Sequence, residues 1–334
     1  MAQKTKPTGG GRVRLHVVTG KGGTGKSTAA AALALALASG GRKVLLCEVE
    51  GRQGIAQLFD VPPLPYDERK VAVAPGGGDV FALSIDPEAA LLEYLDMYYR
   101  LGRAGRALDR FGVIDFATTI APGLRDVLLT GKVYEAVRRR ARKGVQQPAY
   151  DAVVLDAPPT GRISRFLNVN AAMAGLAKVG PVRNQADAIM TLLRSPRTAV
   201  HLTTVLEEMP VQETQDAIDE LTAAELPVGS VFVNFVRRVG LSDRALDLAE
   251  AGELPEAGIR DGLVDAGIEL TDDLVTALQQ AARQHARRVQ LEATQRELVA
   301  KLDRPVVELP VLVDGVDLGG LYELAQEFRE QGLA

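Results

Sequence analysis

The chain alternates short apolar stretches rich in β-branched residues with longer segments in which apolar positions recur at helical spacing. The first stretch, Val13–Thr19, is followed by a glycine-rich segment and by an alanine-rich helix predicted for Lys26–Ser39. Residues 74–79, which include three glycines, are predicted to be a loop. Strands that alternate with helices predict an α/β fold with a mostly parallel sheet sandwiched by helices. The predicted strands cover residues 13–19, 43–49, 150–157, 199–205, 228–236 and 305–309.

Three longer segments carry helical periodicity without a convincing strand. Two of them, at about 87–147 and 163–196, predict a helical subdomain beside the sheet. The third predicts a further helical block at about 241–303. The polar residues 1–12 are expected to be a disordered lead, and residues 13–334 to form a single domain around the sheet.

Composition places the 334-residue chain among ordinary globular proteins, with 46% hydrophobic and 25% charged residues. Its formal net charge of −4 argues against a nucleic-acid-binding surface, so no nucleic acid partner is expected. The longest apolar run, from Ala29 to Ala38, is too short to cross a bilayer, so no intrinsic membrane segment is expected. Cys47 is the only cysteine, which excludes an internal disulfide and favours a reducing, cytoplasmic setting.

The sequence GKGGTGKS, which begins at Gly20, matches the pattern G-x-x-x-x-G-K-[ST] between a predicted strand and a predicted helix. Glycines allow the backbone to wrap closely around phosphate groups, and the helix N-terminus adds positive potential there. Lys26 is expected to reach the β- and γ-phosphates, and the hydroxyl of Ser27 to bind Mg²⁺ directly. The motif therefore predicts a P-loop site for a nucleoside triphosphate with Mg²⁺. The residues expected at the phosphates are Gly20, Lys21, Gly22, Gly23, Thr24, Gly25, Lys26, Ser27 and Thr28.

A second lysine, Lys21, precedes Lys26 in this motif. The form GKGGTGKST resembles the deviant Walker A motif of a class of P-loop ATPases. This class includes arsenite-pump ATPases, tail-anchored-protein-targeting ATPases, septum-site and partition ATPases, and nitrogenase iron protein. The resemblance implies that the nucleotide is ATP, and that Lys21 acts across a dimer interface on the partner's nucleotide, as an arginine finger does. The alternative interpretation is an exposed loop lysine without that role.

A second motif narrows the class. The sequence DAPPTGRISRFL, which begins at Asp156, resembles the second switch segment of the arsenite-pump and tail-anchored-protein-targeting ATPase family. The resemblance implies that Asp156 binds Mg²⁺ through a water, and that Pro159, Thr160 and Gly161 belong to a loop that moves when the γ-phosphate leaves. Arg162 departs from the family pattern, which usually has histidine there.

A third motif, LLCEVEGRQGIAQLF, begins at Leu45 and resembles the first switch segment of the same family. It places Glu50 where the family has an aspartate that positions the attacking water, so Lys21, Lys26 and Glu50 are the predicted catalytic residues. Glutamate is one methylene longer than aspartate, and a displacement of about 1 Å can cost about 10²-fold in rate. The departure predicts slow ATP hydrolysis, or none without a partner.

Two weaker matches concern the adenine. Asn234 ends a predicted strand where the family places an adenine-reading asparagine, and Pro310 and Val311 resemble the family's adenine-flanking segment. An asparagine at a strand end is a turn residue at least as often as a ligand. From Val13 to Phe328 the chain is similar to single-unit members of the family found in actinobacteria. Because it carries one ATPase unit, a homodimer or a heterodimer with a paralogous ATPase is expected.

The resemblance also limits the cofactors to ATP and Mg²⁺. The family's metalloid site needs three cysteine thiolates, its eukaryotic zinc site needs a CxxC pair, and an iron–sulfur cluster needs several cysteines. The lone Cys47 therefore predicts no arsenite site, no zinc and no iron–sulfur cluster. Two functions remain. The first is a dimeric switch ATPase that couples its nucleotide state to a client protein or a membrane-protein partner. The alternative is an ATP-binding regulatory subunit with little turnover, paired with a catalytic paralogue.

Overall fold

The lead predicted at residues 1–12 lies outside the part of the chain that the computed structural model describes. Residues 100–121, 142–146 and 170–180, which belong to the predicted helical subdomain, also lie outside it. The described ranges are 13–99, 122–141, 147–169, 181–237, 239–313 and 315–334.

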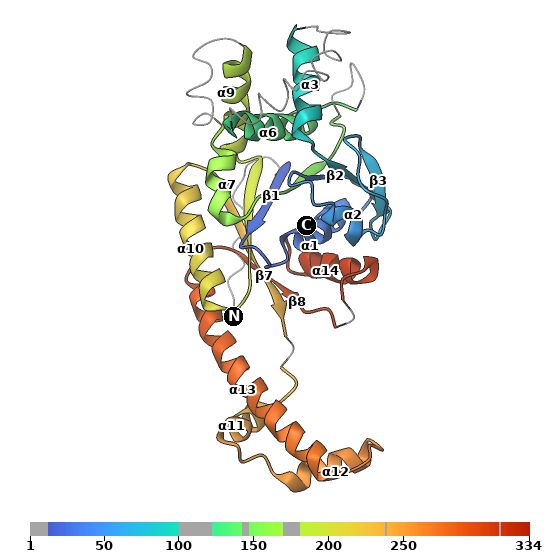
Figure 1. The fold of residues 1–334 in the computed structure, drawn as a ribbon, viewed down its shortest axis with the longest axis vertical. Coiled ribbons are helices and arrows are strands. Elements are labelled where there is room, and N and C mark those ends of the chain that lie inside the picture. The colour runs from blue at the N-terminus through green and yellow to red at the C-terminus, as the bar shows by residue number, and fades with distance from the viewer. Residues whose placement is uncertain (1–12, 100–121, 142–146, 170–180, 238, 314) are drawn as a thin grey trace.

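An eight-stranded sheet forms the centre of the described chain (Figure 1). Its strands are β1 Leu15–Gly20, β2 Lys43–Glu48, β3 Arg69–Val73, β4 Asp79–Ser84, β5 Ala152–Asp156, β6 Thr198–Thr204, β7 Val228–Val236 and β8 Val306–Pro310. They lie in the order β3-β4-β2-β5-β1-β6-β7-β8, and all neighbours are parallel except β3 and β4. The predicted α/β fold with a mostly parallel sheet is confirmed.

Strands β3 and β4 form an antiparallel hairpin at one edge of the sheet. The sequence pattern predicts only the loop at 74–79, which is the turn of this hairpin and which the N–H of Ala74 closes by donating to the carbonyl oxygen of Gly78 at 2.7 Å. The first residues of β3 are Arg69 and Lys70, and most of the strand is exposed. An exposed, charged edge strand lacks the continuous apolar run that marks buried strands, and this is why β3 was missed. Strand β4 is mostly buried and does carry an apolar run, Val80–Leu83, which was overlooked because it directly follows the glycine-rich loop.

Helices cover both faces of the sheet because alternate strand residues face opposite sides. Leu15 and Val17 of β1 pack into one apolar cluster, and Val18 packs into the other. The helices of the first cluster are α6 Pro122–Arg138, α7 Thr160–Leu167, α9 Pro181–Leu193 and α10 Glu208–Ala223. Those of the second cluster are α1 Lys26–Ala38, α2 Gly54–Leu58 and α14 Leu318–Glu330.

Helix α1 follows the glycine-rich motif and is buried on every side. Its residues from Ala29 to Ala38 are at most 5% exposed, and the many alanines allow the sheet and α14 to approach closely. Phe328 of α14 also packs edge-on against Phe232 of β7, with ring centroids 4.8 Å apart. A helix that is apolar all round is stable only inside the core, so the sheet and α14 together fix the start of α1.

Helices α3 Pro87–Tyr99 and α9 both contact α6, and the three lie together at one end of the molecule (Figure 1). All three lie within the segments predicted to form a helical subdomain, which stays a prediction. Among the described helices, none combines the length and the apolar content needed to span a bilayer.

A helical arm connects β7 to β8 and extends from the opposite end of the molecule (Figure 1). It lies within the segment predicted to be helical at about 241–303. The hydroxyls of Ser242 and Thr271 cap two of its helices by accepting hydrogen bonds from backbone N–H groups. The longest helix spans about 44 Å, and Val299 in its last turn packs into the first apolar cluster. The helices of the arm are α11 Asp243–Ala251, α12 Glu256–Asp265 and α13 Asp272–Ala300.

Candidate nucleotide-binding site

The glycine-rich loop runs from the end of β1 to the start of α1, as predicted from the motif. Gly25, the residue before α1, has a φ of 83°, and a Cβ there would lie 2.2 Å from Nδ2 of Asn234. At Gly20 a Cβ would lie 2.2 Å from the carbonyl oxygen of Thr203. These two positions accept only glycine, because any side chain would collide with a neighbouring strand.

The loop is braced from strand β7. The amide Nδ2 of Asn234, a residue 3% exposed, donates to the carbonyl oxygen of Thr24 at 3.0 Å. The hydroxyl of Thr24 donates in turn to the carbonyl oxygen of Lys21 at 2.9 Å. Asn234 therefore holds the shape of the loop, a role that the sequence analysis did not identify. Reading of adenine by Asn234 stays a prediction.

Ser27 and Asp156 meet at the mouth of the loop. The Ser27 hydroxyl, on the first turn of α1, donates to Oδ2 of Asp156 at 2.6 Å. Burial raises the pKa of Asp156 to about 6, although this hydrogen bond and the positive charge of Lys26 act to lower it. A hydroxyl and a carboxylate are oxygen donors of the kind that Mg²⁺ prefers, so the two residues fit the predicted ion.

Lys26 lies beside this pair. Burial lowers the pKa of its ammonium, although the charges of Asp156 and Glu50 favour the protonated form. The hydrogen bond described for Lys26 Nζ is long, 3.5 Å to the carbonyl oxygen of Lys21. A partly desolvated ammonium with one weak acceptor is well suited to receive phosphate oxygens.

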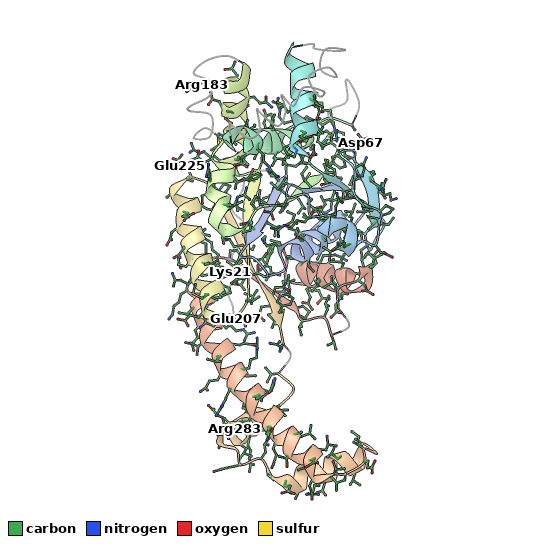
Figure 2. All side chains as sticks on the ribbon, in the orientation of Figure 1. Lys21, Asp67, Arg183, Glu207, Glu225 and Arg283 are labelled. Atoms are coloured by element: carbon green, nitrogen blue, oxygen red, sulfur yellow. The ribbon has the colours of Figure 1, made fainter. Side chains whose placement is uncertain are left out.

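The other lysine of the motif points elsewhere. Lys21 Nζ donates to Oε1 of Glu213, on α10 of the same chain, at 2.6 Å, and each side chain is about one third exposed. Figure 2 shows Lys21 beside α10. The single chain therefore holds this lysine with one of its own carboxylates.

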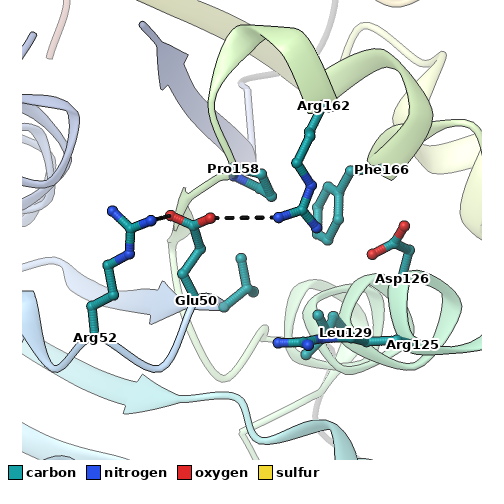
Figure 3. A pocket seen from close by; sticks show the side chains of 9 residues that line it. Glu50, Arg52, Arg125, Asp126, Leu129, Pro158, Arg162 and Phe166 are labelled. Carbon is teal, nitrogen blue, oxygen red and sulfur yellow. Dashed lines mark ion pairs between the residues drawn. The ribbon is translucent and has the colours of Figure 1, made fainter. Parts of the chain in front are cut away.

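Glu50 lies just after β2, between two guanidinium groups (Figure 3). Its carboxylate oxygens are 3.6 Å from Arg52 and 3.8 Å from Arg162. The three residues line a pocket of about 120 Å³ together with Asp126, whose pKa is raised by burial. Arg162, which stands where the related family usually has histidine, is thus one of the groups that hold Glu50.

The predicted second switch segment follows β5 and runs directly into α7. Pro159 precedes the helix, Thr160 begins it and is buried, and the N–H of Arg162 donates to the carbonyl oxygen of Pro159 at 2.8 Å. A side chain at Gly161 would meet no atom within 4 Å. The segment is therefore helical from Thr160 onward in this structure, and its movement stays a prediction.

One acidic residue at the site was missed. Glu48 is the last residue of β2 and is 3% exposed. Its Oε1 accepts from the N–H of Gly54 at 3.0 Å, and burial raises the pKa of its carboxyl group while backbone N–H groups act to lower it. The available signal was an ionisable residue inside the apolar stretch KVLLCEV.

The residues predicted to flank adenine lie at the end of β8. The N–H of Val311 donates to the carbonyl oxygen of Val236 at 3.0 Å, which joins this segment to the strand that carries Asn234. Pro310 lines a pocket of about 310 Å³ with Val236. Contact with adenine stays a prediction for all three residues.

Cys47 lies in the core, and burial raises the pKa of its thiol. No group of three or more His, Cys, Asp or Glu side chains in the described residues is placed to hold a metal ion. The Mg²⁺ expected here would instead draw part of its coordination from nucleotide phosphates and water.

Comparison with known proteins agrees with this geometry. The profile of the anion-transporting ATPase family matches residues 13–195. The chain is 58% identical to ATPase BagA of Mycobacterium tuberculosis over 321 residues, which cover 96% of this chain and 94% of that protein. It is 27% identical to ATPase GET3 of Kluyveromyces lactis over 251 residues, or 65% of this chain and 70% of that protein. It is also 27% identical to ATPase get3 of Schizosaccharomyces pombe, over 65% of this chain and 71% of that protein.

Proposed function

Because the chain belongs to the anion-transporting ATPase family, we propose that it is a dimeric, Mg²⁺-dependent switch that hydrolyses ATP slowly. Its nucleotide state would control the binding of a client protein or a membrane-protein partner in the cytoplasm. The observation that supports this function best is the hydrogen bond between Ser27 and Asp156 beside the ammonium of Lys26. It brings the predicted Mg²⁺-binding residues together at the phosphate loop.

Nucleotide binding follows from the loop geometry. Backbone N–H groups from Gly22 to Thr28 and the positive end of α1 would hold the phosphates, and Lys26 would neutralise the β- and γ-phosphates. The hydroxyl of Ser27 would bind Mg²⁺ directly, and Asp156 would bind it through water. The ion would offset negative charge on the phosphates during transfer. Asn234 keeps the loop in the shape that this requires.

The proposed role of Lys21 needs a second subunit. Its ion pair with Glu213 is partly exposed, and such a pair contributes at most about 1 kcal/mol. A partner's nucleotide, which carries several negative charges, can therefore compete for the lysine. The pair would separate as a homodimer, or a heterodimer with a paralogous ATPase, closes around nucleotide.

The alternative function is an ATP-binding regulatory subunit whose turnover depends on a catalytic paralogue. The surroundings of Glu50 favour it. Arg52 and Arg162 both hold the carboxylate that would have to orient the attacking water. A carboxylate that is one methylene longer than the family's aspartate is a poor water-positioning group.

ATP binding and steady-state ATP hydrolysis by wild type, Lys26→Ala and Glu50→Asp would separate these functions. Slow turnover that Lys26→Ala abolishes supports a self-sufficient ATPase. If the wild-type chain binds ATP without turnover, and Glu50→Asp restores the turnover, the regulatory subunit is supported. Absence of ATP binding by the wild-type chain would contradict both.

A further inference from the structure

Two carboxylates stand side by side at the end of the central sheet. Glu48 of β2 and Asp156 of β5 are paired in register on neighbouring parallel strands. Such residues point to the same face of a sheet from strands about 4.8 Å apart. Leu46 and Val154, each two residues earlier, both pack into the cluster that contains α1. Glu48 and Asp156 therefore both project toward the first turn of α1.

That turn carries Ser27, and Glu48 borders the same space. A Cβ on Gly54 would lie 3.9 Å from Oε1 of Glu48 and 3.9 Å from the hydroxyl oxygen of Ser27. The other neighbour of Ser27 is Asp156, which accepts its hydrogen bond. Asp156 thus contacts the hydroxyl directly, and Glu48 and the hydroxyl both lie beside Gly54.

Only one of the two carboxylate oxygens of Glu48 accepts a hydrogen bond from the described residues. Oε1 accepts from the N–H of Gly54, but Oε2 is buried and has no hydrogen-bond partner among the described residues. Burying an unpaired carboxylate oxygen is costly, and a second carboxylate nearby adds repulsion. A cation between them would remove both costs.

We propose that Glu48 is a second carboxylate of the Mg²⁺ site and binds the ion, directly or through one of its waters, together with Asp156. The inference rests on the proposed function, since the ion arrives with the nucleotide. Mg²⁺ is commonly held by one or two carboxylates together with phosphates and water, and this arrangement supplies the second carboxylate. Oε1 of Glu48 also anchors Gly54, so the metal site and the segment after Glu50 share one side chain.

The competing explanation is that Glu48 only anchors the backbone near Gly54. Glu48→Gln separates the two roles, because the amide oxygen still accepts from the Gly54 N–H while the negative charge is lost. The matched control is Glu292→Gln. It also removes a largely buried carboxylate, but one that pairs with Arg237 and Arg288 at the base of the arm.

The test uses Mn²⁺ as a paramagnetic substitute for Mg²⁺, together with a non-hydrolysable ATP analogue. Bound metal is measured from the loss of the free-Mn²⁺ signal in electron paramagnetic resonance, and nucleotide affinity is measured separately in EDTA. Glu48→Gln is expected to weaken Mn²⁺ binding by about 10- to 100-fold, as loss of a metal-supporting partner typically does, and to leave affinity in EDTA within about twofold. Glu292→Gln is expected to change neither quantity.

Wild-type Mn²⁺ affinity in folded Glu48→Gln would overturn the inference and leave Glu48 as a backbone anchor. If that variant does not fold, Glu48→Asp replaces it. The shorter side chain moves the carboxylate away from the proposed metal site by about one methylene. Weaker Mn²⁺ binding by this variant supports the inference, and unchanged Mn²⁺ binding overturns it. A wild-type chain that binds no nucleotide, even in EDTA, refutes the proposed function itself. Nucleotide binding with an unaffected Glu48→Gln refutes only the role of Glu48.

Discussion

At the scale of single residues, the phosphate loop depends on side chains far away in the sequence. Asn234 holds the carbonyl oxygen of Thr24, Asp156 receives the hydroxyl of Ser27, and Glu213 receives the ammonium of Lys21. The motif alone supplies the backbone that can surround a phosphate. Residues from β5, β7 and α10 decide how that backbone and Lys21 are placed.

Replacement of Asn234 by alanine tests whether this residue braces the loop, reads adenine, or does both. Its Nδ2 already donates to Thr24, so Oδ1 is the acceptor left for an adenine amino group. We expect Asn234→Ala to lower the free energy of unfolding by about 1–3 kcal/mol, since it leaves a buried carbonyl unpaired. Binding of ATP and GTP should both weaken, and ATP more than GTP. Equal losses, measured by titration calorimetry, would leave only the bracing role.

Glu213→Gln removes the negative charge that pairs with Lys21 on its own chain, although the amide oxygen can still accept a hydrogen bond. If Lys21 acts on a partner's nucleotide, removal of a competing ion pair worth up to about 1 kcal/mol should raise ATP turnover by up to about fivefold. The gain should be largest at protein concentrations where dimers are partly populated. Asp219→Asn is the control, because Asp219 is exposed on the same helix and accepts a hydrogen bond only from Gln215 among its described contacts. A fall in turnover with Glu213→Gln would contradict the proposed role of Lys21.

At the scale of elements, sequence patterns predicted most of the strands and the helical arm, but missed the hairpin at one edge of the sheet. All six predicted strands are present, and the strand–loop–helix context of the motif is confirmed, because continuous apolar runs and glycine spacing are local properties. Strand β3 was missed because it is charged and exposed, and the buried strand β4 was missed because its short apolar run directly follows a glycine-rich loop. Glu48 was missed because only the register of β2 with β5 shows that it lies beside Asp156.

Helix α14 supports the phosphate loop from behind α1, and this can be tested through Phe328. This fully buried ring packs against Phe232 and belongs to the apolar cluster that contains α1. We expect Phe328→Ala to lower the free energy of unfolding by about 3–5 kcal/mol, because the cavity cannot close between a sheet and a helix. Denaturant unfolding measures the change. Leu291→Ala, at a position 67% exposed on α13, should change stability by less than about 0.5 kcal/mol.

At the scale of the whole molecule, the arm is inserted between the two strands that carry the predicted adenine-binding residues. It leaves the sheet after β7, which contains Asn234, and returns into β8, which ends at Pro310. The two strands are paired from Val231 to Val233 and again at Val236, with an irregularity in between, and the N–H of Val311 also donates to the carbonyl oxygen of Val236. The arm and the predicted adenine-binding residues are therefore both attached to β7 and β8.

Stability of the whole chain should depend on pH through the buried His201. Its Nδ1 accepts from the N–H of Ser230 at 3.1 Å, its Nε2 lies 3.1 Å from His16 Nδ1, and burial and the charge of His16 hold its pKa well below 6.5. Below pH 6.5 this histidine is protonated in the unfolded chain but stays neutral in the folded chain, so acidification favours unfolding. The contribution of His201 to the free energy of unfolding is fully present above pH 6.5, and it falls by about 1.4 kcal/mol for each pH unit below 6.5.

His201→Gln removes this titration, so the stability difference between wild type and variant should shrink on acidification. Titrating groups other than His16, whose ring contacts His201, cancel in that difference as long as both proteins keep the same fold. Urea unfolding of both proteins at pH 7.5 and pH 5.5 measures it, and we expect the difference to narrow by about 1.4 kcal/mol. A difference that is the same at both pH values would mean that His201 takes up a proton as readily in the folded chain as in the unfolded one. The stack with Phe232 and the hydrogen bond from Ser230 would then fail to keep the ring neutral.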